Sequence, residues 1–230
     1  MQRSTLRKAF QMSLATAAVA ALLPGVANAS YATPNPDLSL ACGLKVTIVL
    51  DASSSIRDFK PDARSAVTEA AQAFGEAFAG TGSTLGVVSF REDAVTSLAP
   101  TVVTHESTAK GGSFYNALHS NPANPRNYFD FASTGSGTNW ESGLALANSL
   151  GHSDLVVFVT DGQPNHRLIG VGSGAPVTDT AENSARDAQD LSQAIKNSNT
   201  KVLGIGVGEV MATTTLANYN SPTPPVALEY

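Results

Sequence analysis

The chain is 230 residues long and carries a formal net charge of −5 at neutral pH. This length predicts a single α/β domain with a sizeable core and short tails. The acidic balance argues against nucleic-acid binding, because such a surface repels the phosphate backbone.

The first 29 residues have the organisation of a secretory signal peptide. Arg3, Arg7 and Lys8 are basic, residues 12–23 form a short apolar stretch, and residues 27–29 read Ala-Asn-Ala, a typical cleavage signal. The apolar stretch is too short and too rich in alanine for a membrane span, and no other segment of the sequence is long enough for one. Cleavage leaves 201 residues and removes three positive charges, which shifts the formal net charge from −5 to −8. We therefore expect a protein that is secreted or displayed at the cell surface.

Residues 30–42 contain Pro34 and Pro36 and predict an extended linker before a domain that covers residues 43–212. Cys42 is the only cysteine. In an exported protein it either pairs with a cysteine of another chain or domain, or packs as a small residue beside the first strand. Residues 213–230 form a tail, which either adds a last edge strand or continues into a longer protein.

Hydrophobic periodicity predicts strands that alternate with helices. The predicted strands cover residues 44–50, 85–90, 95–103, 155–159 and 202–207, and the longer helices cover residues 61–79, 140–150 and 179–197. Two of the strands are apolar on both faces, which is typical of the centre of a parallel sheet. The short connection before residues 95–103 requires an antiparallel partner. The predicted fold is therefore a doubly wound, Rossmann-like α/β sheet, mostly parallel, with helices on both faces and one antiparallel edge strand.

The segment from residue 105 to residue 137 is the least regular part of the sequence. It is rich in glycine, proline and asparagine, and we expect a short helix at residues 114–119 followed by a surface loop. Thr138 and Glu141 have the spacing of a capping box for the next helix. We expect no strand before Ser173, so the Gly-Ser-Gly sequence around it makes no nucleophile elbow.

Oxygen-bearing side chains follow the two most apolar strands. Asp51, Ser53 and Ser55 alternate directly after the first, and Asp161 follows the strand at residues 155–159. Because ligands of such sheets bind beyond the carboxyl ends of the strands, we expect these groups to meet at one edge. Oxygen ligands of this kind suit a hard cation.

Each motif also has a simpler interpretation. The Asp51 to Ser55 segment would serve as a turn that caps the following helix, and Thr138 would serve as a helix N-cap. Ser54 lies between Ser53 and Ser55 and is expected to point the other way. The four histidines lack the spacing of a zinc site.

The three segments together, Asp-x-Ser-x-Ser, Gly-x-Gly-Thr-Asn and Val-Thr-Asp-Gly, resemble those of the von Willebrand factor type A family. The likeness extends over residues 44–210, and the motifs occur in the expected order. In that family these loops form the metal-ion-dependent adhesion site. The resemblance implies a bound divalent cation, Mg²⁺ or else Mn²⁺ or Ca²⁺.

The resemblance also implies a role for each residue at the site. Ser53 and Ser55 would bind the metal through their hydroxyl groups, and Thr138 would bind it directly or through water. Asp51 and Asp161 would act mainly through bound waters and through hydrogen bonds to the serines.

The expected function is adhesion, in which a protein or extracellular-matrix ligand presents an acidic side chain to the metal. We expect no enzyme activity and no catalytic residues, since no nucleophile or general base with a positioned partner is visible. The alternatives are a metal-dependent hydrolase that uses the same site, and a non-adhesive assembly or scaffold subunit of a larger surface protein.

The exported protein is expected to begin at Ser30. Mass spectrometry of protein recovered outside the producing cell measures this directly, because cleavage removes residues 1–29 as one piece. An exported chain that retained residues 1–29 would contradict the signal-peptide assignment.

Overall fold

The structure is a computed structural model that describes residues 43–57, 61–131, 135–170 and 172–207. The expected signal peptide, the linker with Cys42, and the tail at residues 213–230 lie outside these ranges. Within them, no helix is both long and apolar enough to cross a membrane.

Within the described residues, the five strands and three longer helices predicted from the sequence are all present. In chain order the elements are β1 (Lys45–Asp51), α1 (Ser54–Arg57), α2 (Pro61–Phe78), β2 (Thr84–Phe90), β3 (Ala94–Val102), α3 (His105–Thr108), α4 (Ser113–Leu118), α5 (Trp140–Ser149), β4 (Leu155–Thr160), β5 (His166–Gly170), β6 (Ser173–Thr178), α6 (Ala181–Asn197) and β7 (Lys201–Gly206).

Five strands form one mixed sheet in the order β3-β2-β1-β4-β7. β1 lies at the centre and is parallel to both β2 and β4, and β7 is parallel to β4. β3 is the antiparallel strand and lies at the edge beside β2. The prediction of a mostly parallel α/β sheet with one antiparallel edge strand is confirmed.

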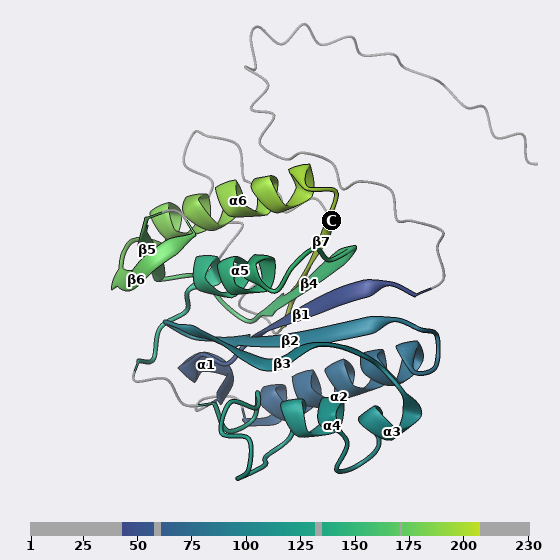
Figure 1. Cartoon of the computed structure of the whole chain (residues 1–230). Helices are drawn as coiled ribbons and strands as arrows, with labels where there is room; N and C mark the ends of the chain where they lie inside the picture. The colour runs from purple at the N-terminus through teal and green to yellow at the C-terminus, as the bar shows by residue number, and fades with distance from the viewer. Residues whose placement is uncertain (1–42, 58–60, 132–134, 171, 208–230) are drawn as a thin grey trace, which may run out of the picture.

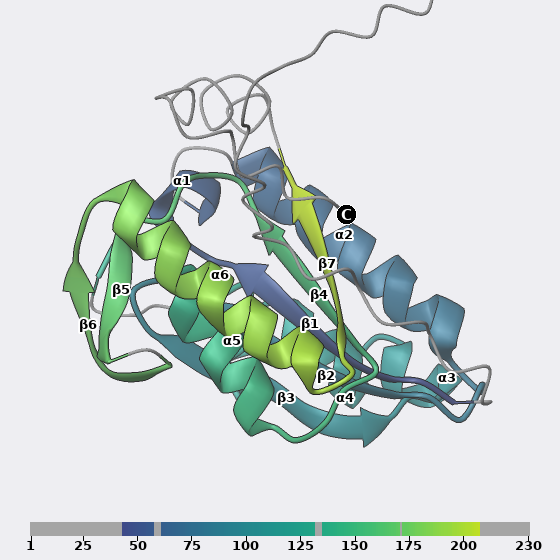
Figure 2. The ribbon, with the colours of Figure 1, turned by 90° about the horizontal axis from the view of Figure 1, so that it is seen from above.

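Helices cover both faces of this sheet, as Figures 1 and 2 show. α2 lies on one face, with α3 and α4 beside it, and α5 and α6 lie on the other. Alternate residues of β1 serve the two layers: Leu50 belongs to the same apolar cluster as Val67 of α2, and Val49 to that of Leu144 of α5. Burial of each such side chain contributes about 1.5–3 kcal/mol, so the central strand holds both layers.

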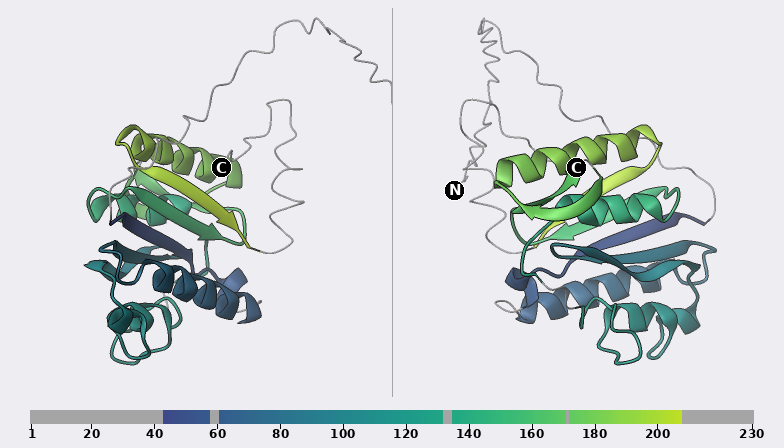
Figure 3. Two further views of the ribbon diagram at one scale, coloured as in Figure 1. Left: turned by 90° about the vertical axis from the view of Figure 1, so that its right-hand side faces the viewer. Right: turned by 60° about the vertical axis from the view of Figure 1, so that its left-hand side comes forward.

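A second, two-stranded sheet consists of the antiparallel hairpin β5–β6. It lies beside the start of α6 and near α5, at the same end of the large sheet as α1 (Figures 1 and 3). The prediction that no strand precedes Ser173 is wrong, because β5 ends at Gly170 and Ser173 opens β6. Ser173 nevertheless opens a strand rather than a helix, so it is not a nucleophile elbow.

The irregular segment after β3 contains two short helices. α4 confirms the short helix expected near residue 114, whereas α3 was not predicted. Beyond α4, the Asp130 carboxylate accepts hydrogen bonds from the Ser120 hydroxyl, the Asn121 main-chain N–H and the Asn127 side-chain amide, at 2.9–3.0 Å. These bonds hold the asparagine-rich loop without regular secondary structure.

Gly143 allows α5 to approach the sheet closely. A Cβ atom at this position would lie 2.9 Å from Cδ1 of Phe90 and 3.0 Å from Cγ1 of Val49. We expect Gly143→Ala to lower the free energy of unfolding by about 1–3 kcal/mol, because overpacking outweighs the gain of about 1 kcal/mol in helix propensity. Urea denaturation measures the change.

Gly162→Ala is the matched control. A Cβ atom at Gly162 meets no atom of the described residues within 4 Å, so we expect a change below about 1 kcal/mol. Equal losses in the two variants would contradict the packing argument.

Candidate metal centre

The parallel pairing of β1 and β4 brings their carboxyl ends to one edge of the sheet (Figure 2). Asp51 is the last residue of β1, and Asp161 directly follows β4. The Ser55 hydroxyl donates to Oδ1 of Asp161 at 2.7 Å, and the hydroxyl oxygens of Ser53 and Ser55 are 2.8 Å apart. Hydrogen bonds therefore join three of the expected ligands into one chain beside Asp51.

Asp51 is fully buried, and both of its carboxylate oxygens have donors. Oδ1 accepts from the Ser53 main-chain N–H at 2.8 Å, and Oδ2 accepts from the Thr160 hydroxyl at 2.6 Å. Burial raises the pKa of Asp51 to about 6; hydrogen bonds from Ser53 and Thr160 oppose this rise, and the charge of Asp161 adds to it. A neighbouring cation would offset the cost of ionising this carboxyl group.

The bond from Ser53 N–H to Asp51 is the turn that the simpler interpretation of this segment predicted. The turn and the hydroxyl chain occur together, since the turn uses the main chain of Ser53 and the chain uses its side chain. The turn therefore presents the Ser53 hydroxyl toward Ser55.

Main-chain hydrogen bonds place Thr138, whose side chain is largely buried. Its N–H donates to Oδ1 of Asn165 at 2.8 Å, and its carbonyl accepts from the N–H groups of Asn165 and His166 at 2.9 and 3.2 Å. Within the described residues, no side-chain hydrogen bond joins Thr138 to the other four expected ligands. Thr138 is fixed instead against the start of the β5–β6 hairpin.

The loop that leads to Thr138 is bound from two sides. Glu92 Oε1 accepts from the main-chain N–H groups of Ser136 and Gly137 at 3.0 and 3.3 Å, and the Ser136 carbonyl accepts from the Ser54 hydroxyl at 3.0 Å. Ser54 does point away from Ser53, as the alternation predicts, but it bridges two loops of the site. It is therefore not a neutral position.

The predicted capping box at the start of α5 is wrong. The N-cap is Asn139, whose side chain accepts from the Ser142 N–H at 3.0 Å. Thr138 lies one residue before the cap, so the alternative in which it acts as the N-cap does not occur. Because Asn139 is the N-cap, the Thr138 side chain does not cap the helix.

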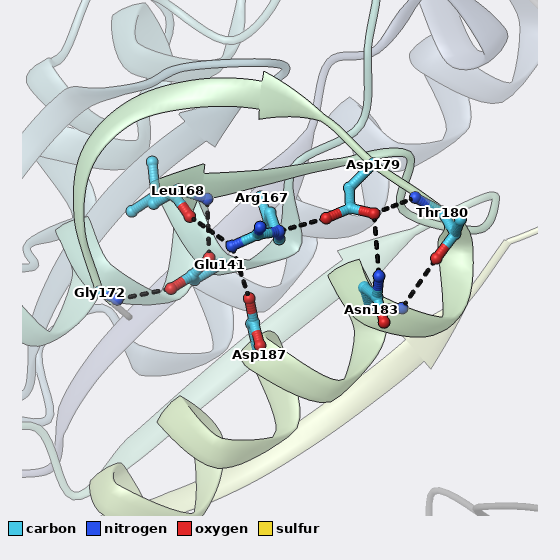
Figure 4. Close-up of polar contacts among 8 residues, drawn as sticks. All are labelled: Glu141, Arg167, Leu168, Gly172, Asp179, Thr180, Asn183 and Asp187. Atoms are coloured by element: carbon cyan, nitrogen blue, oxygen red, sulfur yellow. Dashed lines mark hydrogen bonds and ion pairs between the residues drawn. The ribbon is translucent and has the colours of Figure 1, made fainter. Parts of the chain in front are cut away.

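Glu141 anchors the hairpin instead of capping the helix, as Figure 4 shows. Its fully buried carboxylate accepts from the main-chain N–H of Leu168 at 2.8 Å and from that of Gly172. An ionised carboxylate in the first turn of a helix also interacts favourably with the helix dipole. The buried carboxyl group of Glu141 thus links α5 to two main-chain donors of the hairpin.

Arg167 joins the same hairpin to α6 (Figure 4). It donates to the Asp179 carboxylate, and its Nη1 lies 3.5 Å from Oδ2 of Asp187. The hydrogen bond from Arg167 is the main reason why the pKa of Asp179 falls to about 2, with Asn183 and the Thr180 N–H adding to the effect. The hairpin is therefore attached to α5 through Glu141 and to α6 through Arg167.

Three residues that the sequence interpretation missed also build the site. Thr160 holds Asp51, Glu92 holds the loop before Thr138, and Asn165 holds Thr138 itself. Thr160 precedes Asp161 at the end of a buried strand, so its polar side chain was a usable signal. The polar turn after β2 and the segment after Asp161 carried no comparable pattern.

The gathered groups fit a hard divalent cation. Within the described ranges, no three His, Cys, Asp or Glu side chains form a group that could hold a metal ion, so the candidate donor set combines two carboxylates with hydroxyl oxygens. Adjacent ligands of an octahedral Mg²⁺ lie about 2.9 Å apart, and the Ser53 and Ser55 oxygens are 2.8 Å apart. Oxygen donors of this kind suit Mg²⁺, Mn²⁺ and Ca²⁺.

The raised pKa of Asp51 predicts a pH dependence in metal-free protein. Between about pH 4 and about pH 6, the folded chain retains the Asp51 proton after the unfolded chain has released it. This group therefore makes the free energy of unfolding fall as the pH rises through that window. Asp51→Asn cannot ionise and removes this component. Urea denaturation in EDTA measures both proteins, and parallel pH profiles for the two would contradict the assignment.

Comparison with known proteins places this geometry among solved structures. No protein-family model and no curated protein matches the chain. A structure of proximal thread matrix protein 1 from the mussel byssus, with a zinc-occupied MIDAS motif, is 19% identical over 75% of this chain and 40% of its own, with a TM-score of 0.51. The pilus adhesin SpaC from Lactobacillus rhamnosus GG is 14% identical over 75% of this chain and 25% of its own, also at 0.51.

A von Willebrand factor type A protein from Catenulispora acidiphila is 20% identical over 75% of this chain and 35% of its own, with a TM-score of 0.49. The chain thus spans between a quarter and two fifths of the length of these three proteins. At such identities a structural match establishes the fold. The chain has the fold of von Willebrand factor type A domains.

Proposed function

We propose that this domain binds a protein or extracellular-matrix ligand through a divalent cation, and that its role is adhesion outside the cell. The observation that carries the proposal is the chain of hydroxyl and carboxylate oxygens formed by Ser53, Ser55 and Asp161 beside buried Asp51. Thr138, on the neighbouring loop, completes the proposed set.

The donor chemistry supports ligand binding rather than cation storage. The hydroxyl groups of Ser53 and Ser55 are neutral, and each of the two carboxylates already accepts a hydrogen bond from the protein. A Mg²⁺ ion held in this way keeps positions for water and supplies an attachment point for an acidic side chain of a partner. A storage site would instead surround the ion with its own carboxylates.

The comparisons support the same class of function. One similar structure is a matrix protein with a zinc-occupied MIDAS motif, and another is a pilus adhesin. The expected signal peptide supports a location in the medium or at the cell surface. We propose Mg²⁺, or else Mn²⁺ or Ca²⁺, as the cation, because the donors are all oxygen atoms.

Metal binding to the purified domain tests the proposal first. Calorimetry is expected to detect Mn²⁺ and Mg²⁺ at millimolar concentration or below, and Ser53→Ala or Asp51→Ala is expected to weaken binding about tenfold or more. Both variants are expected to fold, since the site lies at the edge of the sheet. Absence of metal binding in the unaltered protein would refute the proposed function.

The control for Ser53→Ala is Ser149→Ala. Ser149 is exposed at the far end of α5 and its hydroxyl bonds only locally, to the Leu146 carbonyl. We expect unchanged metal affinity in this variant. Partner capture that is lost with EDTA and restored with Mn²⁺ would support adhesion, whereas metal-dependent turnover in a hydrolase screen would favour the enzyme alternative.

A further inference from the structure

Trp140, the first residue of α5, belongs to an apolar cluster but also makes a buried hydrogen bond. Its ring packs edge-on against Phe158 with centroids 5.9 Å apart, while its indole N–H donates to the Thr160 hydroxyl at 3.2 Å. Because an indole can only donate, this bond occupies an acceptor position on the Thr160 oxygen.

The Thr160 hydroxyl has one proton, and the indole leaves that proton for an acceptor. Two acceptors are near: Oδ2 of Asp51 at 2.6 Å and the Gly162 carbonyl at 3.3 Å. The shorter contact, to a carboxylate, receives the proton, because hydrogen bonds to ionised acceptors are shorter and stronger than those to neutral ones. The Trp140 N–H thus occupies the acceptor side of the Thr160 oxygen and helps to fix the orientation in which this hydroxyl donates to Asp51.

The result is that both oxygens of Asp51 are fixed. Oδ2 receives the Thr160 hydroxyl, and Oδ1 receives the Ser53 N–H. These two bonds set the plane of the carboxylate and leave its remaining lone pairs in defined directions. Buried, fully satisfied networks of this kind hold one geometry because any other would leave a polar group unpaired.

We infer that Trp140 is a positioning residue of the cation site, acting on Asp51 through Thr160. The relay crosses three elements, α5, β4 and β1, and Trp140 lies only two residues after Thr138. It therefore ties the loop that carries Thr138 to Asp51. The inference rests on the proposed function, since it concerns the orientation of a group for the proposed cation.

Trp140→Phe keeps an aromatic ring at this position and removes the indole N–H together with part of the ring volume, so a packing control is needed. We expect its Mn²⁺ dissociation constant, measured by calorimetry, to rise about tenfold, as for other residues that orient metal ligands. Thr160→Val is expected to have at least this effect, and Thr160→Ser, which retains the hydroxyl, to restore most of the affinity. An unchanged dissociation constant in Trp140→Phe would overturn the inference.

The double variant separates a relay from two independent effects. If Trp140 acts only through Thr160, adding Trp140→Phe to Thr160→Val costs little further affinity. Losses that multiply would overturn the inference. Phe158→Leu is the packing control: it removes the ring against which Trp140 packs but none of the hydrogen bonds of the relay, and we expect lower stability with Mn²⁺ affinity within about twofold of the unaltered protein. A loss equal to that of Trp140→Phe would also overturn it.

A second measurement needs no change at Trp140. The chain contains a single tryptophan, so its indole N–H gives one proton resonance. We expect this resonance to shift on addition of Mg²⁺ and in Thr160→Val, and a resonance unmoved by both would overturn the inference. If the unaltered protein binds no Mn²⁺, the proposed function fails and the inference falls with it. If the unaltered protein and Trp140→Phe bind Mn²⁺ with the same affinity, only the inference fails.

Discussion

The hydrogen bond from Thr160 to Asp51 joins two neighbouring parallel strands at the level where both end. Strands β1 and β4 are central and apolar, so their side chains are committed to the two helical layers until the last residues. The two carboxylates, Asp51 and Asp161, lie where these strands leave the core. The shared end point therefore concentrates Asp51, Asp161 and the serines at one edge, and the loops and hairpin around them are arranged to hold that edge.

Sequence reasoning succeeded where a local pattern decides the structure. The apolar runs before Asp51 and Asp161 identify central parallel strands, because only a strand buried on both faces lacks a polar side. The rule that such strands present ligands beyond their carboxyl ends then places the two aspartates together. The alternation of Ser53 and Ser55 likewise predicts that their side chains lie together in the turn that begins at Asp51, and their hydroxyl groups do form a hydrogen bond.

It failed where partners distant in the sequence decide. Glu141 has capping-box spacing, yet its carboxylate binds main-chain donors of a hairpin about thirty residues further on. The N-cap of α5 is Asn139 instead. The hairpin itself contains Pro176 and several glycines, which weaken any strand signal. Ser54 has no sequence feature that reveals its contact with the Ser136 carbonyl, since that contact exists only after both loops have folded.

The anchoring of the hairpin by Glu141 has a consequence for how this surface can diverge. Both donors to Glu141 are main-chain N–H groups, so the bonds do not depend on the side chain at residue 168. Gly172 is more restricted, because its φ of 70° favours glycine. Side chains on the outward face, such as the exposed Ile169, can therefore be exchanged without loosening the attachment. A chain built in this way can acquire new surface specificity beside a candidate metal centre that stays unaltered.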